Sequence, residues 1–128
     1  MNSLQPGTIV SVAIGPLTHF GIISDQQGAG FPYIISCSRR TGQVAEETAT
    51  VFANGDNIKV HDYPGQLNPY QVIQRARSKL GTKYDLFKWN CEHFVRWAHD
   101  LKLESPQLQI AAILGVVSFL LFGIARKT

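Results

Sequence analysis

The most constraining feature of this 128-residue chain is a cysteine set among polar residues where a helix is expected to begin. The segment reads Asn90-Cys91-Glu92-His93-Phe94. Asn90 is a good N-cap residue, so Cys91 falls in the first helical turn, where unpaired backbone N–H groups and the helix dipole stabilise an anion. A thiolate needs such positive potential. A fold that uses this cysteine must therefore bring a base to the start of that helix.

The base that best suits this cysteine lies far upstream, at His19 in the segment Thr18-His19-Phe20-Gly21-Ile22. His19 stands at the edge of an expected core strand, which would hold its imidazole rigidly. An imidazole that takes the thiol proton makes Cys91 a nucleophile. Triads of this kind use a third polar residue to orient the imidazole, and Ser36 on the neighbouring strand is the candidate. The pattern predicts a cysteine-dependent acyl-transfer enzyme.

The other cysteine and histidines have plainer interpretations. Cys37 lies in an apolar run and is expected to be a small buried residue. His93 is expected to support the helix, and His61 and His99 are expected at the surface. The sequence contains no CxxC or HExxH pattern, and its histidines lack ligand spacing, so we expect neither a metal nor a cofactor.

The first half of the chain predicts an antiparallel meander, because short β-rich runs alternate with turn residues. The expected strands are residues 8–14, 19–23, 33–37, 50–53 and 57–63. Residues 38–50 are polar and give no clear prediction.

The second half predicts two helices. Asn68 is expected to cap the first, with Pro69 at its first position and Gln71 completing a capping box. Its expected apolar stripe is Tyr70, Ile73, Ala76 and Leu80, and Gly81 is its expected stop. The second helix is expected from about residue 90 to 103, with a buried stripe of Phe94, Trp97, Ala98 and Leu101.

The C-terminal residues 108–125 predict a membrane anchor, so we divide the chain into a domain at 1–106 and an anchoring helix at 107–128. The segment reads LQIAAILGVVSFLLFGIA, and its helical length of about 27 Å approaches a hydrocarbon core of about 30 Å. The alternative is a buried terminal helix, but a domain of about a hundred residues can hardly surround a helix that is apolar on every face. Ala111 and Gly115 form a small-xxx-small pattern suited to self-association.

Composition limits the expected partners and cellular location of the protein. The formal charge is +3 with scattered basic residues, which indicates a solvated surface or attraction to anionic headgroups. No nucleic-acid recognition motif accompanies them, so nucleic acid is not an expected partner. Two cysteines are too few for a disulfide framework, and the N-terminus lacks a secretory signal. We expect a single-pass C-terminal anchor with the domain in the cytosol, although the basic tip Arg126-Lys127 favours the opposite topology.

Several motifs together carry a resemblance to a known family. They are the box at 90–95, the segment 6–10 ahead of His19, the stretch 76–81 followed by Tyr84-Asp85-Leu86, and the apolar tail. The chain resembles the lecithin:retinol acyltransferase-like proteins, especially the small phospholipase A/acyltransferases related to the H-Ras-like suppressors.

The resemblance implies an α+β fold of the permuted papain-like cysteine hydrolase type, in which an antiparallel sheet packs with helices and the histidine precedes the cysteine. It implies removal of an acyl chain from a glycerophospholipid through an acyl-Cys91 thioester, with His19 as general base. Water, an amine or a lysophospholipid then accepts the acyl group. Many family members carry a second histidine where this chain has Ser36, so this position departs from the pattern.

Two other functions stay open. The same chemistry suits a cysteine peptidase or amidase of the same superfamily, although a peptide substrate needs no lipid anchor. A non-catalytic membrane-tethered relative is the third interpretation, and the serine at position 36 is its motivation.

Overall fold

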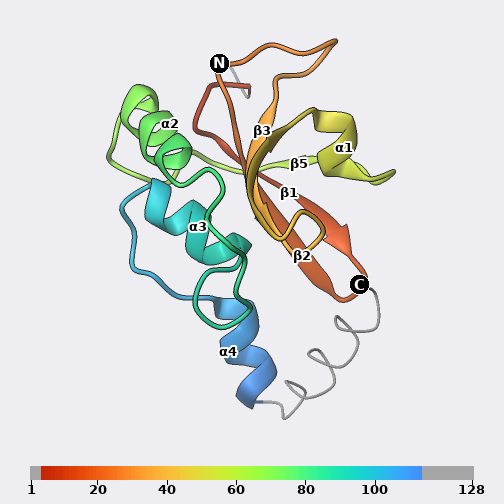
Figure 1. Ribbon diagram of the computed structural model, residues 1–128, viewed down its shortest axis with the longest axis vertical. Coiled ribbons are helices and arrows are strands. Elements are labelled where there is room, and N and C mark those ends of the chain that lie inside the picture. Colours follow the sequence, from red (N-terminus) through yellow and green to blue (C-terminus); the bar gives the residue numbers. More distant parts are fainter. Residues whose placement is uncertain (1–3, 114–128) are drawn as a thin grey trace.

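The computed structural model describes residues 4–113, in which five strands form one antiparallel sheet with helices packed on it (Figure 1). The strands lie in the order β4-β3-β2-β1-β5. Their bounds are β1 Ile9–Ile14, β2 Leu17–Ile23, β3 Ile34–Ser38, β4 Gln43–Glu47 and β5 Lys59–Val60. The prediction of an α+β fold with an antiparallel sheet is confirmed, and the first three expected strands are present within one or two residues of their predicted ends.

Pairing within the sheet is uneven, and this unevenness creates an opening. Strands β1 and β2 pair along their whole length, from Ile9 opposite Ile22 to Ile14 opposite Leu17. Strands β2 and β3 share only two pairs, Ile22 with Ile35 and Ile23 with Ile34. Beyond Ile22 the two strands separate, so the backbone of β2 on that side has no strand to bond to.

The helices cover both faces of the sheet (Figure 1). Helices α2 (Pro69–Ser78) and α3 (Cys91–Ala98) pack on one face, and the short α1 (Ala49–Ala53) packs on the other. Helix α4 (Pro106–Ile113) follows α3. One core cluster joins the sheet to α2 and α3, and its buried members include Ile22, Ile35, Cys37, Ala76, Phe94 and Ala98. A second cluster lies under α1 and comprises Val10, Val12, Ile23, Ile34 and Phe52.

The strand predicted at residues 50–53 is wrong, because this segment is helix α1. The Thr48 hydroxyl accepts a hydrogen bond from the Val51 N–H and caps the helix, and Asn54 ends it in the left-handed conformation. Phe52 turns into the core. Local capping and one buried aromatic therefore outweigh the β-propensity of Thr50 and Val51.

The predicted helices need smaller corrections. The capping box at Asn68 and Gln71 is present, but α2 buries Val72 with Ile73 and Ala76, whereas Tyr70 and Leu80 are exposed. Helix α3 ends at Ala98, well before residue 103, and Asp100 lies in the left-handed region. His99 is not at the surface: it is fully buried, and its Nε2 lies 2.6 Å from the Gly7 carbonyl oxygen.

Most of the predicted membrane anchor at 107–128 lies outside the described residues, which include only its first part, in α4. Among residues 4–113, no helix combines the length and apolar character needed to cross a membrane.

The close contact between β2 and α1 yields a prediction. A Cβ atom on Gly21 would lie 2.6 Å from Ile34 Cγ2 and 2.8 Å from Phe52 Cε1. Gly21→Ala should therefore lower the free energy of unfolding by about 1–3 kcal/mol through overpacking. Urea denaturation would measure the loss. The part due to Phe52 should disappear when Gly21→Ala is introduced into a Phe52→Leu background, while the part due to Ile34 remains. A cost of equal size in both backgrounds would contradict the contact with Phe52.

Candidate active site

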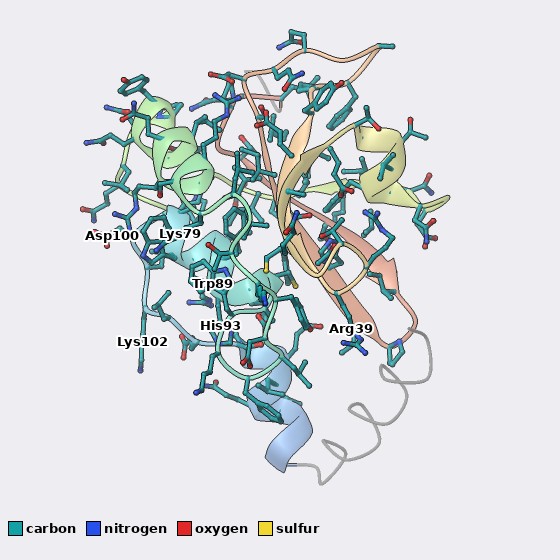
Figure 2. All side chains as sticks on the ribbon, in the orientation of Figure 1. Arg39, Lys79, Trp89, His93, Asp100 and Lys102 are labelled. Atoms are coloured by element: carbon teal, nitrogen blue, oxygen red, sulfur yellow. The ribbon has the colours of Figure 1, made fainter. Side chains whose placement is uncertain are left out.

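Helix α3 begins with a fully formed cap. The Asn90 side-chain oxygen accepts hydrogen bonds from the N–H groups of Glu92, at 2.9 Å, and His93, at 3.2 Å. In return, the Asn90 N–H donates to His93 Nδ1 at 3.0 Å. Figure 2 shows Trp89 and His93 alongside this helix. The supporting role predicted for His93 is confirmed, and the reciprocal bonds fix the first turn that carries Cys91.

The Cys91 thiol lies in the opening between β2 and β3. Its sulfur is 3.8 Å from the Thr18 carbonyl oxygen, and the Phe20 N–H also bonds to it. Both backbone groups point to the side of β2 where β3 has separated. The helix start thus takes the place of a missing strand, and the thiol meets β2 on either side of His19.

Burial dominates the electrostatics of this thiol. Although Cys91 as a residue is half-buried, its sulfur is surrounded by protein atoms, and this burial raises the thiol pKa to about 11. The N–H groups of Phe20, Glu92 and Cys91 act in the opposite direction and lower the pKa, as expected at a helix start. Their effect is the smaller one, so the resting site holds a neutral thiol.

The structure places the His19 imidazole on the α1 face of the sheet. His19 is paired with Val12, which belongs to the cluster under α1, and its ring stacks on Phe52 at a centroid distance of 5.1 Å. Burial, with the Arg40 charge adding to it, lowers the imidazole pKa to about 4. Within residues 4–113, no hydrogen bond joins His19 to Cys91. The backbone of β2 therefore contacts the thiol, whereas the His19 imidazole points to the α1 face of the sheet.

Ser36 lies on the same face as His19, next to Ile34 in the alternation of β3. It is buried, and its hydroxyl has no hydrogen-bond partner among the described residues. Cys37 points to the other face, where it is fully buried as predicted and lies 3.4 Å from the Trp89 carbonyl oxygen. Both cysteines are free thiols.

Tyr84 interacts electrostatically with the thiol, a link that was not predicted from the sequence for this motif residue. Burial raises the pKa of its phenol to about 12, and a negative charge on Cys91 would raise it further. Arg39 opposes this effect. The phenol is therefore a neutral hydroxyl within electrostatic range of the thiol. Its sequence signals are the Tyr84-Asp85-Leu86 motif and its position in a loop shortly before Cys91, and neither predicts this interaction.

Helix α4 also reaches the opening. The Gln107 side chain accepts the Thr18 N–H at 2.8 Å and donates to the Thr18 carbonyl at 2.8 Å. The Glu92 carboxylate accepts from the Ser105 hydroxyl at 2.5 Å and from the Gln107 N–H at 3.2 Å. Residues 105–107 are thereby tied both to β2 and to the helix that carries the thiol.

The fold and site define an α+β domain that presents a cysteine thiol at the start of a helix, against the open edge of a strand. A model of the family described as lecithin retinol acyltransferase matches residues 2–100. The human protein phospholipase A and acyltransferase 2 is 32% identical over 92 residues, which cover 67% of this chain and 57% of the human protein. The chain belongs to the lecithin retinol acyltransferase family. Its matched part spans little more than half of the human relative's length.

Burial of His19 predicts an acid-dependent loss of stability. Because the folded-state pKa is lowered from 6.5 to about 4, the unfolded chain binds the proton first as pH falls. The free energy of unfolding should therefore fall through that window, by up to about 3 kcal/mol from His19 alone. His19→Gln should remove this part of the pH dependence in urea titrations. Above neutral pH, the difference between variant and wild type should not vary with pH. If the free energies of unfolding of wild type and His19→Gln changed in parallel throughout the acid range, the imidazole could not be buried and neutral.

Proposed function

We propose that this protein is a thiol-dependent phospholipid acyltransferase and phospholipase A, which removes an acyl chain from a glycerophospholipid through a thioester on Cys91. The placement of the Cys91 sulfur is the observation that carries the proposal, because it lies at a capped helix start, in an opening of the sheet. Membership of the lecithin retinol acyltransferase family and the name of the human relative support this reaction class.

The chemistry follows from the groups around the thiol. His19 accepts the proton of the Cys91 S–H, and the sulfur attacks the ester carbonyl carbon. Backbone N–H groups at the start of α3 stabilise the oxyanion. The intermediate collapses and expels the lysophospholipid alkoxide, which takes the proton from the imidazolium. Water, an amine or a second lysophospholipid then attacks the thioester and restores the thiol.

The base requires a change of side-chain orientation. The neutral imidazole, with its pKa near 4, is in the form that accepts a proton, and among the described residues it makes no hydrogen bond that holds it over Phe52. The thiol already contacts the backbone on either side of His19, at Thr18 and Phe20. Rotation of the imidazole about its side-chain torsions toward the opening is therefore the step that we assign to substrate binding.

The proposal includes the permuted papain-like arrangement and the membrane. A histidine strand that precedes a cysteine helix, with an antiparallel sheet behind both, supports the former. The apolar residues 108–125 support an anchoring segment at 107–128. We place the domain on the cytosolic side of the membrane and assign self-association to Ala111 and Gly115. A membrane-borne substrate and a membrane-anchored enzyme are consistent with each other.

Trapping the acyl group tests the chemistry. The full chain, incubated with phosphatidylcholine vesicles that carry a labelled acyl chain, should release labelled fatty acid and gain an acyl adduct on the Cys91 peptide by mass spectrometry. Cys91→Ala should abolish both, whereas Cys37→Ala should retain both, because Cys37 is a core residue. Absence of adduct and product with vesicles of several headgroups, or equal activity of Cys91→Ala, would refute the proposal.

Ser36 is proposed as the residue that orients the His19 imidazole, and two measurements separate this role from a structural one. Its hydroxyl is buried without a partner, so Ser36→Ala should leave the free energy of unfolding unchanged or raise it. If the hydroxyl bonds to the imidazole during turnover, kcat should fall by about three- to tenfold, the value of one neutral hydrogen bond. An unchanged kcat would exclude Ser36 as the third residue.

A further inference from the structure

The Gln107 side chain completes the open edge of β2 beside the thiol. In a continuous sheet the Thr18 N–H and carbonyl would bond to β3, but pairing stops at Ile22. Gln107 bonds to both groups, each at 2.8 Å. One amide side chain from α4 thereby replaces the missing strand at the point where the strand meets the thiol.

The Thr18 carbonyl has two donors. Gln107 Nε2 lies at 2.8 Å and Cys91 Sγ at 3.8 Å from the same oxygen. An N–H at this distance is a strong donor, whereas a thiol is a weak one. The amide therefore takes most of the accepting capacity of the oxygen, and the thiol proton is held only loosely.

The backbone of Gln107 is itself held by the helix that carries the thiol. Glu92, the residue after Cys91, accepts hydrogen bonds from the Gln107 N–H and the Ser105 hydroxyl, and Glu92 and Ser105 are buried. The segment thus bridges α3 and β2, the two elements that enclose the sulfur. Residues 105–107 lie beyond the part of the chain that the family model matches, which ends at residue 100.

We propose that Gln107 is a positioning residue of the thiol site: it satisfies the Thr18 carbonyl so that the Cys91 proton is left for the base, and it holds the edge of β2 against α3. The role in turnover rests on the proposed function, but the effect on the thiol does not. The ionisable groups that interact electrostatically with the thiol are Glu92 on its own helix, Cys37 on β3 and Tyr84, and Arg39 acts on Tyr84. Gln107 is uncharged, so it changes the thiol without adding a titration of its own.

Alkylation of Cys91 tests this role in the full chain without any lipid. Without the amide, the Thr18 carbonyl should bind the thiol proton more strongly, so Gln107→Ala should raise the thiol pKa and slow alkylation. We expect about a tenfold lower rate at each pH below the thiol pKa, equivalent to one pKa unit. The rate is followed by mass spectrometry of the Cys91 peptide after reaction with iodoacetamide. Gln107→Glu keeps the side-chain size but cannot donate when ionised, and it should slow the reaction at least as much.

Two controls separate this effect from loosening of the structure. Gln109→Ala changes an exposed glutamine of the same helix and should react as the wild type does. A bulkier maleimide should be slowed by the same factor as iodoacetamide, because a pKa change affects both reagents equally and a change of access does not. Wild-type alkylation rates in both Gln107 variants, an equal slowing in Gln109→Ala, or a faster reaction in Gln107→Ala would overturn the proposal.

Measuring lipid turnover then tests the acyltransferase proposal separately from the positioning role of Gln107. If phosphatidylcholine gives no adduct on the wild-type protein but Gln107→Ala slows alkylation, the acyltransferase proposal fails and the positioning role stands. If the wild type turns over lipid, Gln107→Ala should lower kcat with little change in KM, since Gln107 affects the nucleophile. A lowered kcat with unaltered alkylation would overturn the assigned role while leaving the enzyme activity intact.

Discussion

The early end of the β2–β3 ladder is the constraint on which the site depends. A buried backbone N–H or carbonyl without a partner is costly, so the free edge of β2 beyond Ile22 has to be completed by something other than a strand. The chain completes it with the Cys91 thiol and the Gln107 amide, which lie 73 and 89 residues from Thr18 in sequence. The thiol environment therefore exists only once the domain has assembled as a whole.

Burial gives this site its electrostatic character. The same exclusion of water raises the pKa of Cys91 and lowers that of His19, since both shifts favour the uncharged form. A resting thiolate–imidazolium pair is disfavoured in such surroundings. Charge must therefore develop during the reaction, when the proton moves and the helix N–H groups meet an oxyanion. This distinguishes the site from one that stores a thiolate in advance.

Local chemistry made much of this structure predictable. The caps at Asn68 and Asn90 depend on residues within one turn, so the sequence alone placed both helix starts correctly. Cys91 and His19 followed from the requirements of thiol chemistry, and both residues do lie on elements that meet. The side of the sheet on which an imidazole lies depends on strand register and on neighbours such as Phe52, which belongs to a segment mistaken for a strand. Long-range packing also decided the burial of His99, whose ring meets the Gly7 carbonyl.

The division of the chain at residue 106 is a second case in which local sequence did not predict a long-range contact. A change from mixed to apolar composition marked Pro106 as the end of the domain. Composition predicts how polar the surroundings of a segment are, but not which hydrogen bonds its residues make. The hydrogen bonds of Gln107 to Thr18 and Glu92 belong to the site itself. Because Gln107 is fixed to β2 through its side chain and to α3 through its backbone N–H, any displacement of the first turn of α4 must break bonds to both elements. The start of the apolar segment is thus mechanically part of the thiol site.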